Sequence, residues 1–345
     1  MRIGSAALAA SLLALAACSS AGAPQPGAPG DDAGVIGDPD SGPVGDSPTT
    51  LYVEPTDGEA PLLAALQGAK SAVHVEAYML TDTAIVDALV AAKQAGCDVK
   101  VVLEQNPYMA SGTNDTAYAT LHSAGVLVNW VATSFQLTHT KTIVIDPGQP
   151  TGAVWIMSLN LSKSAFTTNR DYAAVDADPS DVAEADAIIL SDFANVADAR
   201  ASRRLLVSPE DSRTKLAALV DGAAASLDVE MEELSDGAME QKLGDAATRG
   251  VRVRIVVPSS SVSSATTTAL TWLKGRGASV KRLSSPSMHA KAIVADQARA
   301  YVGSVNLTSA SLDKNREIGV ITATPGAVSR LEATIDVDFA KGTAL

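Results

Sequence analysis

Two short segments of this sequence each place a histidine and a lysine two residues apart. Residues at that spacing point to the same face of an extended strand, so each segment can present an imidazole beside an ammonium. Two histidines can supply a nucleophile and an acid, while two lysines can bind the oxygens of a phosphate. This set suits the cleavage of a phosphodiester. Its members are His139, Lys141, His289 and Lys291.

Further polar residues follow in the same order in both segments. An apolar run ends at an aspartate, Asp146 or Asp296, whose carboxylate can orient a group of the neighbouring lobe. Each turn beyond supplies a hydroxyl and an amide as candidate substrate ligands, and an acidic residue then follows Asn-Arg. These residues are Ser158, Asn160 and Asp171 in the first copy and Ser304, Asn306 and Glu317 in the second.

The chain beyond residue 50 is almost entirely a duplication. Each copy predicts a helix, a β-branched strand, a helix, a glycine stop and another β-branched strand, and each ends in a strand and a helix that begins near a proline. Strands that alternate with helices predict a largely parallel sheet with helices on both faces. The early parts align at a shift near 154 and the late parts at 146, as in 51–55 with 205–209, 96–102 with 250–256, and 169–171 with 315–317.

Both copies read His-x-Lys-x4-Asp and continue into Ser-Leu-Asn or Gly-Ser-Val-Asn. This pattern resembles the phospholipase D superfamily, whose members include phospholipases D, cardiolipin and phosphatidylserine synthases, and several nucleases. The resemblance implies that one histidine attacks phosphorus to form a phosphohistidine. The other protonates the departing alcohol and then activates water or a new alcohol. In many relatives the N-terminal histidine, here His139, is the nucleophile, but two near-equivalent copies give no sequence reason for the choice.

The family pattern implies that Asp146 and Asp296 orient the histidines. The acceptor for each ring is alternatively the acidic residue after Asn-Arg, Asp171 or Glu317. The first copy departs from the family twice, with Met157 in place of Gly and with Asp171 in place of the usual Glu. Both departures lie in the N-terminal copy of the motif.

The predicted fold is an α/β arrangement of two phospholipase D-like α/β/α sandwich lobes related by a pseudo-twofold axis. Lobe 1 covers 51–204 and lobe 2 covers 205–345. The two motif strands meet at the lobe interface in one active site, so mutation of either histidine should inactivate the same site.

Several other candidate residues lie outside the two motifs. Glu76 and Glu230 each end a strand, and they either line the cleft or merely close the strand. His74 and His122 are predicted to be structural, and Cys97 is predicted to be a small core residue. Beyond the motifs no His, Cys and Asp cluster has ligand spacing, so the sequence predicts no metal and no cofactor.

The N-terminus predicts export and a lipid anchor. Residues 1–17 hold one positive charge, a short apolar run and small residues before Cys18, which is typical of a lipoprotein signal peptide. Cleavage would leave Cys18 as the lipid-bearing N-terminus on the bacterial cell envelope, at an outer membrane or the cell surface. Residues 18–50 are rich in Ala, Gly, Pro, Ser and Asp and predict a disordered tether.

Charge favours a phospholipid or another small phosphodiester as substrate. The formal net charge is −13, and the loss of one Arg and five Asp with residues 1–50 leaves −9. This balance disfavours nucleic acid, because acidic proteins repel the phosphate backbone. The sequence thus predicts a monomeric phospholipase D-type phosphodiesterase that hydrolyses or transfers a phosphatidyl group. An extracytoplasmic nuclease and a non-catalytic lipoprotein that binds a phosphorylated ligand are the alternatives.

Overall fold

The computed structural model of the chain describes residues 49–131, 134–197, 204–260 and 262–345. The predicted signal peptide, the lipidation site Cys18 and the tether up to residue 48 lie outside these ranges and stay predictions. The first strand, β1 (Thr50–Glu54), begins one residue before the predicted start of lobe 1. Within the described ranges, no helix combines the length and the apolar character that crossing a membrane requires.

Lobe 1 contains the elements up to residue 194. Its helices are α1 (Ala60–Gly68), α2 (Thr83–Gln94), α3 (Asp115–Ser123), α4 (Lys163–Thr167) and α5 (Pro179–Ala194). After β1, its strands are β2 (Ala72–Ala77), β3 (Asp98–Leu103), β4 (Leu127–Trp130), β5 (Lys141–Ile145), β6 (Ala153–Met157) and β7 (Asn169–Asp176).

Lobe 2 repeats these elements in the same order, with two short strands added. Its helices are α6 (Ser212–Asp221), α7 (Gly237–Thr248), α8 (Ser264–Gly275), α9 (Ser309–Asp313) and α10 (Pro325–Lys341). Its strands are β8 (Leu206–Ser208), β9 (Ser226–Met231), β10 (Arg252–Pro258), β11 (Ser279–Leu283), β12 (Ser287–Met288), β13 (Lys291–Ala295), β14 (Arg299–Gly303), β15 (Glu317–Thr322) and β16 (Thr343–Ala344).

The two sheets have the same strand order, which confirms the predicted duplication. Lobe 1 runs β4-β3-β2-β5-β6-β7-β1, and lobe 2 runs β11-β10-β9-β13-β14-β15-β8 with β16 beside β11. The closing helices α5 and α10 begin at Pro179 and Pro325, as predicted.

The prediction of a largely parallel sheet is wrong. In each lobe three neighbouring strands are parallel, β2-β3-β4 in lobe 1 and β9-β10-β11 in lobe 2. The pairs β2-β5, β5-β6, β6-β7 and β7-β1 are antiparallel, and so are the equivalent pairs of lobe 2. The reason lies in the short connections, such as residues 146–152 between β5 and β6. A parallel crossover needs a dozen residues or more, so β5 and β6 can only form a hairpin.

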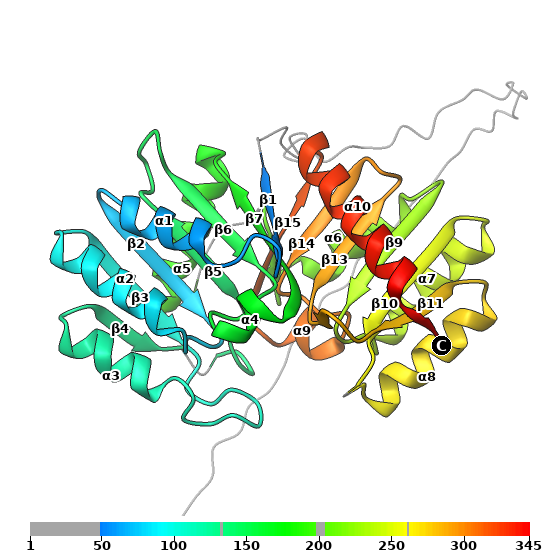
Figure 1. Cartoon of the computed structure of the whole chain (residues 1–345), viewed down its shortest axis with the longest axis horizontal. Helices are drawn as coiled ribbons and strands as arrows, with labels where there is room; N and C mark the ends of the chain where they lie inside the picture. Colours follow the sequence, from blue (N-terminus) through cyan, green and yellow to red (C-terminus); the bar gives the residue numbers. More distant parts are fainter. Residues whose placement is uncertain (1–48, 132–133, 198–203, 261) are drawn as a thin grey trace, which may run out of the picture. The chain divides into compact units, whose positions relative to one another are not determined.

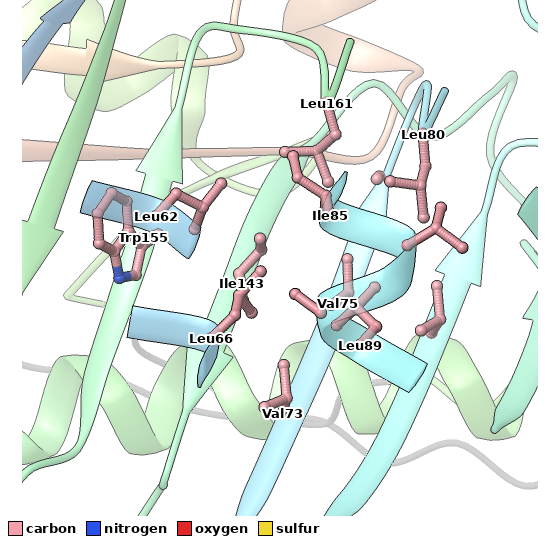
Figure 2. Packing of buried hydrophobic residues seen from close by; sticks show 14 of the residues in the cluster. Leu62, Leu66, Val73, Val75, Leu80, Ile85, Leu89, Ile143, Trp155 and Leu161 are labelled. Carbon is pink, nitrogen blue, oxygen red and sulfur yellow. The ribbon is translucent and has the colours of Figure 1, made fainter. Parts of the chain in front are cut away.

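Each sheet is buried on both faces. In lobe 1, α1 and α2 cover one face and α5 covers the other (Figure 1). Figure 2 shows the first face, where helix side chains pack on alternate residues of the strands. This outer core of lobe 1 includes Leu62, Leu66, Ile85, Leu89, Val73, Val75, Ile143 and Trp155, and also the fully buried Met157.

A central core joins the two lobes. The opposite faces of both sheets pack there with α5 and α10, so that Val144 and Val294, from β5 and β13, belong to one apolar cluster. Lobe 2 also adds a short strand to the sheet of lobe 1, because β12 pairs with β7. β7 lies beside β14 where the lobes meet (Figure 1). The described lobes are therefore parts of one compact unit.

Two buried ion pairs cross the central core, and they are related by the repeat. Arg316, directly before β15, binds Asp192 of α5 with Nε–Oδ2 and Nη2–Oδ1 distances of 2.7 and 3.2 Å. Arg170 of β7 binds Asp338 of α10 through the same atoms. All four side chains are almost inaccessible to solvent. The repeated Asn-Arg segments noted in the sequence therefore bond each lobe to the closing helix of the other.

Replacement of Asp338 should destabilise the protein strongly. Asp338→Ala leaves the Arg170 guanidinium buried without its carboxylate, which typically costs about 3–5 kcal/mol. Urea unfolding followed by circular dichroism measures this change. Lys163→Ala is the matched control, because its bond to Glu59 lies on the surface, and its unfolding midpoint should stay close to wild type. Equal midpoints for the two variants would contradict the role given to the buried pair.

Candidate active site

The backbone of each motif histidine is bound to the opposite lobe. The N–H of His139 donates to the carbonyl of Arg316 at 2.8 Å, and the N–H of His289 donates to the carbonyl of Arg170 at 3.1 Å. These bonds come just before β5 and β13, whose first residues are Lys141 and Lys291. The chain therefore pairs with the opposite lobe at each motif histidine, and it enters the sheet of its own lobe at the lysine.

The rings of the two histidines are also held across the interface. His139 Nδ1 lies 3.0 Å from Glu317 Oε2, and His289 Nδ1 lies 2.9 Å from Asp171 Oδ1. A carboxylate only accepts, so Nδ1 carries the proton in both rings and Nε2 is left for chemistry. The acceptors are the acidic residues after Asn-Arg, which was the second of the two alternatives that the sequence left open.

The role predicted for Asp146 and Asp296 is wrong. Asp146 accepts the N–H groups of residues 70–72, and Asp296 accepts those of residues 224–226. Burial alone would raise the pKa of Asp146, but these N–H donors outweigh it and hold the pKa below its usual value. Both aspartates sit at the far end of a five-residue strand from the lysine, and they fix the turn that precedes β2 or β9.

Two other pairs predicted to bind substrate lie behind the site. Ser158 Oγ donates to Asp171 Oδ1 at 2.7 Å, and Ser304 Oγ accepts the N–H of Ile318 at 3.2 Å, next to Glu317. Both serines and both acidic residues are inaccessible to solvent. The polar groups of these four residues are taken up by these bonds and by the motif histidines, so the prediction that they bind substrate is wrong, and they position the histidines instead.

The two lysines are completely buried and place positive charge next to the histidines. Each Nζ donates to the carbonyl of its own motif histidine, at 2.5 Å for Lys141 and 2.6 Å for Lys291. Burial and then repulsion from Lys291 lower the pKa of Lys141 well below its usual value. Burial also lowers the pKa of His139, against the opposing pull of Glu317, so this imidazole favours its neutral form.

Both histidines open onto one cavity of about 520 Å³. Two motif asparagines line it, and their role as substrate ligands stays a prediction. Asn306 Oδ1 accepts the N–H of Glu233, so the NH₂ group is the part of this amide left for a ligand. The remaining lining residues are Tyr78, Met79, Tyr108, Gln136, Leu137, Asn160, Glu232, Glu233, Thr308, Ala310, Ser311 and Asn315.

Glu76 and Glu230 do not line this cavity. Thr138 Oγ1 donates to Glu76, and Tyr172 Oη donates to Glu230 at 2.5 Å. Both carboxyl groups lie next to the buried arginine pairs, and burial raises the pKa of Glu230 to about 8. They are therefore part of the interface between the lobes.

The remaining histidines and the cysteine are structural, as predicted. His74 is buried with Nδ1 2.5 Å from Asp186 of α5, and His122 stacks on Tyr118 on the surface of α3. Cys97 is buried just before β3. Among the described residues, no group of three His, Cys or acidic side chains is arranged to hold a metal ion.

Met157 fits where the other copy requires glycine. A Cβ on Gly303 would approach the Cα of Gly319 to 2.5 Å and the hydroxyl of Tyr301 to 2.9 Å. Lobe 1 has Trp155 in place of Tyr301, and Trp155 stacks on Tyr52 instead. Met157 packs into the outer core of lobe 1.

Sequence reasoning missed the residues that make the two halves of the site differ. Tyr78 and Glu232 occupy equivalent positions of the repeat. The Tyr78 ring meets His139 edge-on at 4.7 Å between centroids, and Lys141 Nζ lies 4.8 Å from its centre. Glu232 instead lies 2.7 Å from Lys291 Nζ and 3.7 Å from His289 Nε2. Alignment of the two copies just after β2 and β9 would have revealed this difference, because it places Tyr78 opposite Glu232.

Comparisons with known proteins agree with this geometry. The family model described as "Cardiolipin synthase, PLD-like domain" matches residues 62–193 and 216–339, which is most of the chain. The chain therefore belongs to the phospholipase D superfamily. Its two lobes and the interface between them are the superfamily's α/β fold.

Individual relatives are more distant. Cardiolipin synthase A of Pseudomonas aeruginosa is 32% identical over 111 residues, which cover 31% of this chain and 22% of the relative. Phospholipase D Z of Dictyostelium discoideum is 42% identical over 87 residues, 23% of this chain and 20% of that protein. The matches thus span about a fifth of the curated relatives. The crystal structure of phosphatidylserine synthase from Haemophilus influenzae Rd KW20 has the same fold, with a TM-score of 0.67, 13% identity, and coverage of 86% of this chain and 87% of that one.

Loss of a cross-lobe carboxylate should impair turnover far more than loss of the motif aspartate. Asp171→Asn and Glu317→Gln remove the charged acceptor of an imidazole N–H, so we expect kcat for phosphodiester cleavage to fall on the order of 10²–10⁴-fold. Asp146→Asn and Asp296→Asn should lower thermal stability and leave kcat near wild type. Kinetics of the four variants on bis(p-nitrophenyl) phosphate provide the comparison. The reverse order of effects would restore the role first assigned to Asp146 and Asp296.

Proposed function

We propose that this chain is a phospholipase D-type hydrolase that cleaves the head-group phosphodiester of phospholipids through a phosphohistidine. The single observation that carries the proposal is the meeting of two motif histidines, each with Nδ1 bound to a buried carboxylate, at one cavity. Membership of the phospholipase D superfamily supports phosphodiester chemistry. The names of the matched relatives, which include a phospholipase D and a cardiolipin synthase, support a phospholipid substrate.

In the first step His139 Nε2 attacks phosphorus. The new P–N bond forms as the bond from phosphorus to the head-group oxygen breaks, and His289 Nε2–H gives its proton to that oxygen. Lys141 and Lys291 neutralise charge on the phosphoryl oxygens, which is the largest contribution such a site can make. In the second step water attacks phosphorus, His289 takes its proton, and the P–N bond breaks to release the phosphatidic product.

The surroundings of the two histidines support this division of roles. His139 favours the neutral, nucleophilic form because burial lowers its pKa. His289 has a carboxylate near each nitrogen, Asp171 at 2.9 Å and Glu232 at 3.7 Å, so both ring N–H groups face an acceptor when this residue carries the proton for the leaving oxygen.

Charge and placement support a lipid over a nucleic acid. Arg252 and Arg254 belong to the densest basic groups in the sequence, but both bind Asp228 and neither lines the cavity. The proposed lipid anchor at Cys18 would hold the site near a membrane surface. Transfer to an alcohol would use the same phosphohistidine, with the alcohol in place of water.

The covalent step can be isolated with bis(p-nitrophenyl) phosphate, whose leaving group needs no proton. We expect His289→Ala to release one equivalent of p-nitrophenol in a burst and to retain a phosphoryl adduct on His139, detected by mass spectrometry. His139→Ala should give neither burst nor adduct.

Three outcomes would contradict the proposal in different ways. An adduct on His289 in the His139→Ala protein would reverse the two roles. Cleavage of plasmid DNA without cleavage of phospholipid would favour the nuclease alternative. Wild-type protein that binds vanadate and cleaves no phosphodiester would favour the non-catalytic alternative.

A further inference from the structure

The two walls of the cavity differ in chemistry, although the repeat makes them equivalent. Lobe 1 contributes Tyr78, Met79 and Tyr108, whereas lobe 2 contributes Glu232 and Glu233 at the positions of Tyr78 and Met79. One histidine opens beside each wall. A phosphodiester also has two sides, because two different alcohols are joined through one phosphorus. The walls can therefore distinguish the two alcohols.

The position of Glu232 ties the acidic wall to the reacting centre. Its carboxylate is bound to Lys291 Nζ, and it lies near the nitrogen of His289 that faces the cavity. Burial would raise the pKa of Glu232, but His289 and Lys291 outweigh burial and hold the pKa far below its usual value. The wall thus carries a fixed negative charge next to the lysine that is placed to bind phosphate.

A Lys–Glu pair of this kind is complementary to a zwitterion. A phosphate bound at Lys291 competes with Glu232 for the Lys291 ammonium. The Glu232 carboxylate can then pair with another cation. An alcohol that carries an ammonium group on a two-carbon arm supplies that cation next to its own phosphate. An alcohol that carries a second phosphate would be repelled by Glu232, since like charges at close range in a partly buried site cost free energy.

The lobe 1 wall suits the other alcohol. Tyr78 and Met79 are apolar neighbours of His139, and Tyr108 extends the same wall with 77% of its surface exposed. The backbone N–H of Tyr108 donates to the Tyr78 hydroxyl at 2.7 Å, which holds the two aromatic residues together. Apolar and aromatic surface of this type binds the acylated glycerol side of a lipid better than a charged head group.

We infer that Glu232, assisted by Glu233, selects phosphodiesters whose leaving alcohol carries an ammonium group, and places that alcohol beside His289. This inference rests on the proposed function and adds the substrate class and its orientation. It makes Glu232 a specificity determinant in direct contact with the substrate. Its counterpart Tyr78 defines the opposite, apolar side.

Monomeric short-chain phosphatidylcholine, phosphatidylethanolamine, phosphatidylglycerol and phosphatidylmethanol provide the test, with phosphatidic acid as the measured product. Wild type should cleave the two ammonium lipids with a kcat/KM about tenfold or more above that for phosphatidylmethanol, the scale of one partly buried ion pair. Glu232→Gln should bring this ratio close to one. Glu233→Gln should lower it less. Glu240→Gln removes a charge from α7 outside the cavity and should leave the ratio unchanged.

The ratio separates the inference from simpler roles. If Glu232 served only as the counter-ion of Lys291, Glu232→Gln would change kcat/KM for all four lipids equally, and an unchanged ratio would overturn the inference. A wild-type preference for phosphatidylglycerol that Glu232→Gln abolishes would overturn it in favour of hydroxyl recognition. Wild type that cleaves none of the four lipids would reject the proposed function, and the inference would fall with it.

Discussion

Each motif histidine is held by the lobe that does not contain it. Two adjacent residues of the opposite lobe supply both contacts: the arginine carbonyl accepts the histidine N–H, and the carboxylate of the next residue accepts the ring Nδ1–H. Two contacts from adjacent residues fix both the position and the rotation of the imidazole. The cavity exists only while the lobes are docked. Folding of the whole chain is therefore a condition for assembly of the site.

The same two segments of the chain also carry the charges that dock the lobes. Arg170 and Arg316 precede Asp171 and Glu317 directly, and each binds a buried aspartate of the other lobe's closing helix. Buried ion pairs of this kind add little net stability relative to apolar packing, because desolvation offsets the Coulomb attraction. They instead raise the free energy of any other arrangement of the lobes, because an arginine would then be buried without its carboxylate. A shift of the interface would separate the arginine pairs and the histidine pairs together.

The sequence was sufficient to predict that the motif histidines and lysines meet at one site, and insufficient to predict the residues that support them. The spacing of His139 and Lys141, repeated at His289 and Lys291, predicted one site at the lobe interface. The orienting role that the family pattern implied for Asp146 was wrong, since five residues of strand extend about 16 Å and carry the aspartate away from the histidine. The true acceptors come from the other lobe, and nothing in a linear sequence states which copy of a repeat bonds to which.

Alignment of the two copies held more information than the shared motif. Positions where the copies agree build the common frame, as with Ser158 and Ser304 behind the carboxylates. Positions where they differ give the site its direction, as with Tyr78 and Glu232. The mixed sheet followed from connection length, because the segment between β5 and β6 is too short for a crossover helix.

Nitrogen NMR of protein labelled with ¹⁵N-histidine tests the cross-lobe pairing most directly, because the chain has four histidines. In wild type, His139 and His289 should both show a downfield Nδ1–H proton that is protected from solvent. Asp171→Asn should remove or shift this signal for His289, in the other lobe, and leave that of His139 in place, while Glu317→Gln should do the opposite. A change confined to the histidine in the same lobe as the mutation would contradict the exchange of histidines between the lobes.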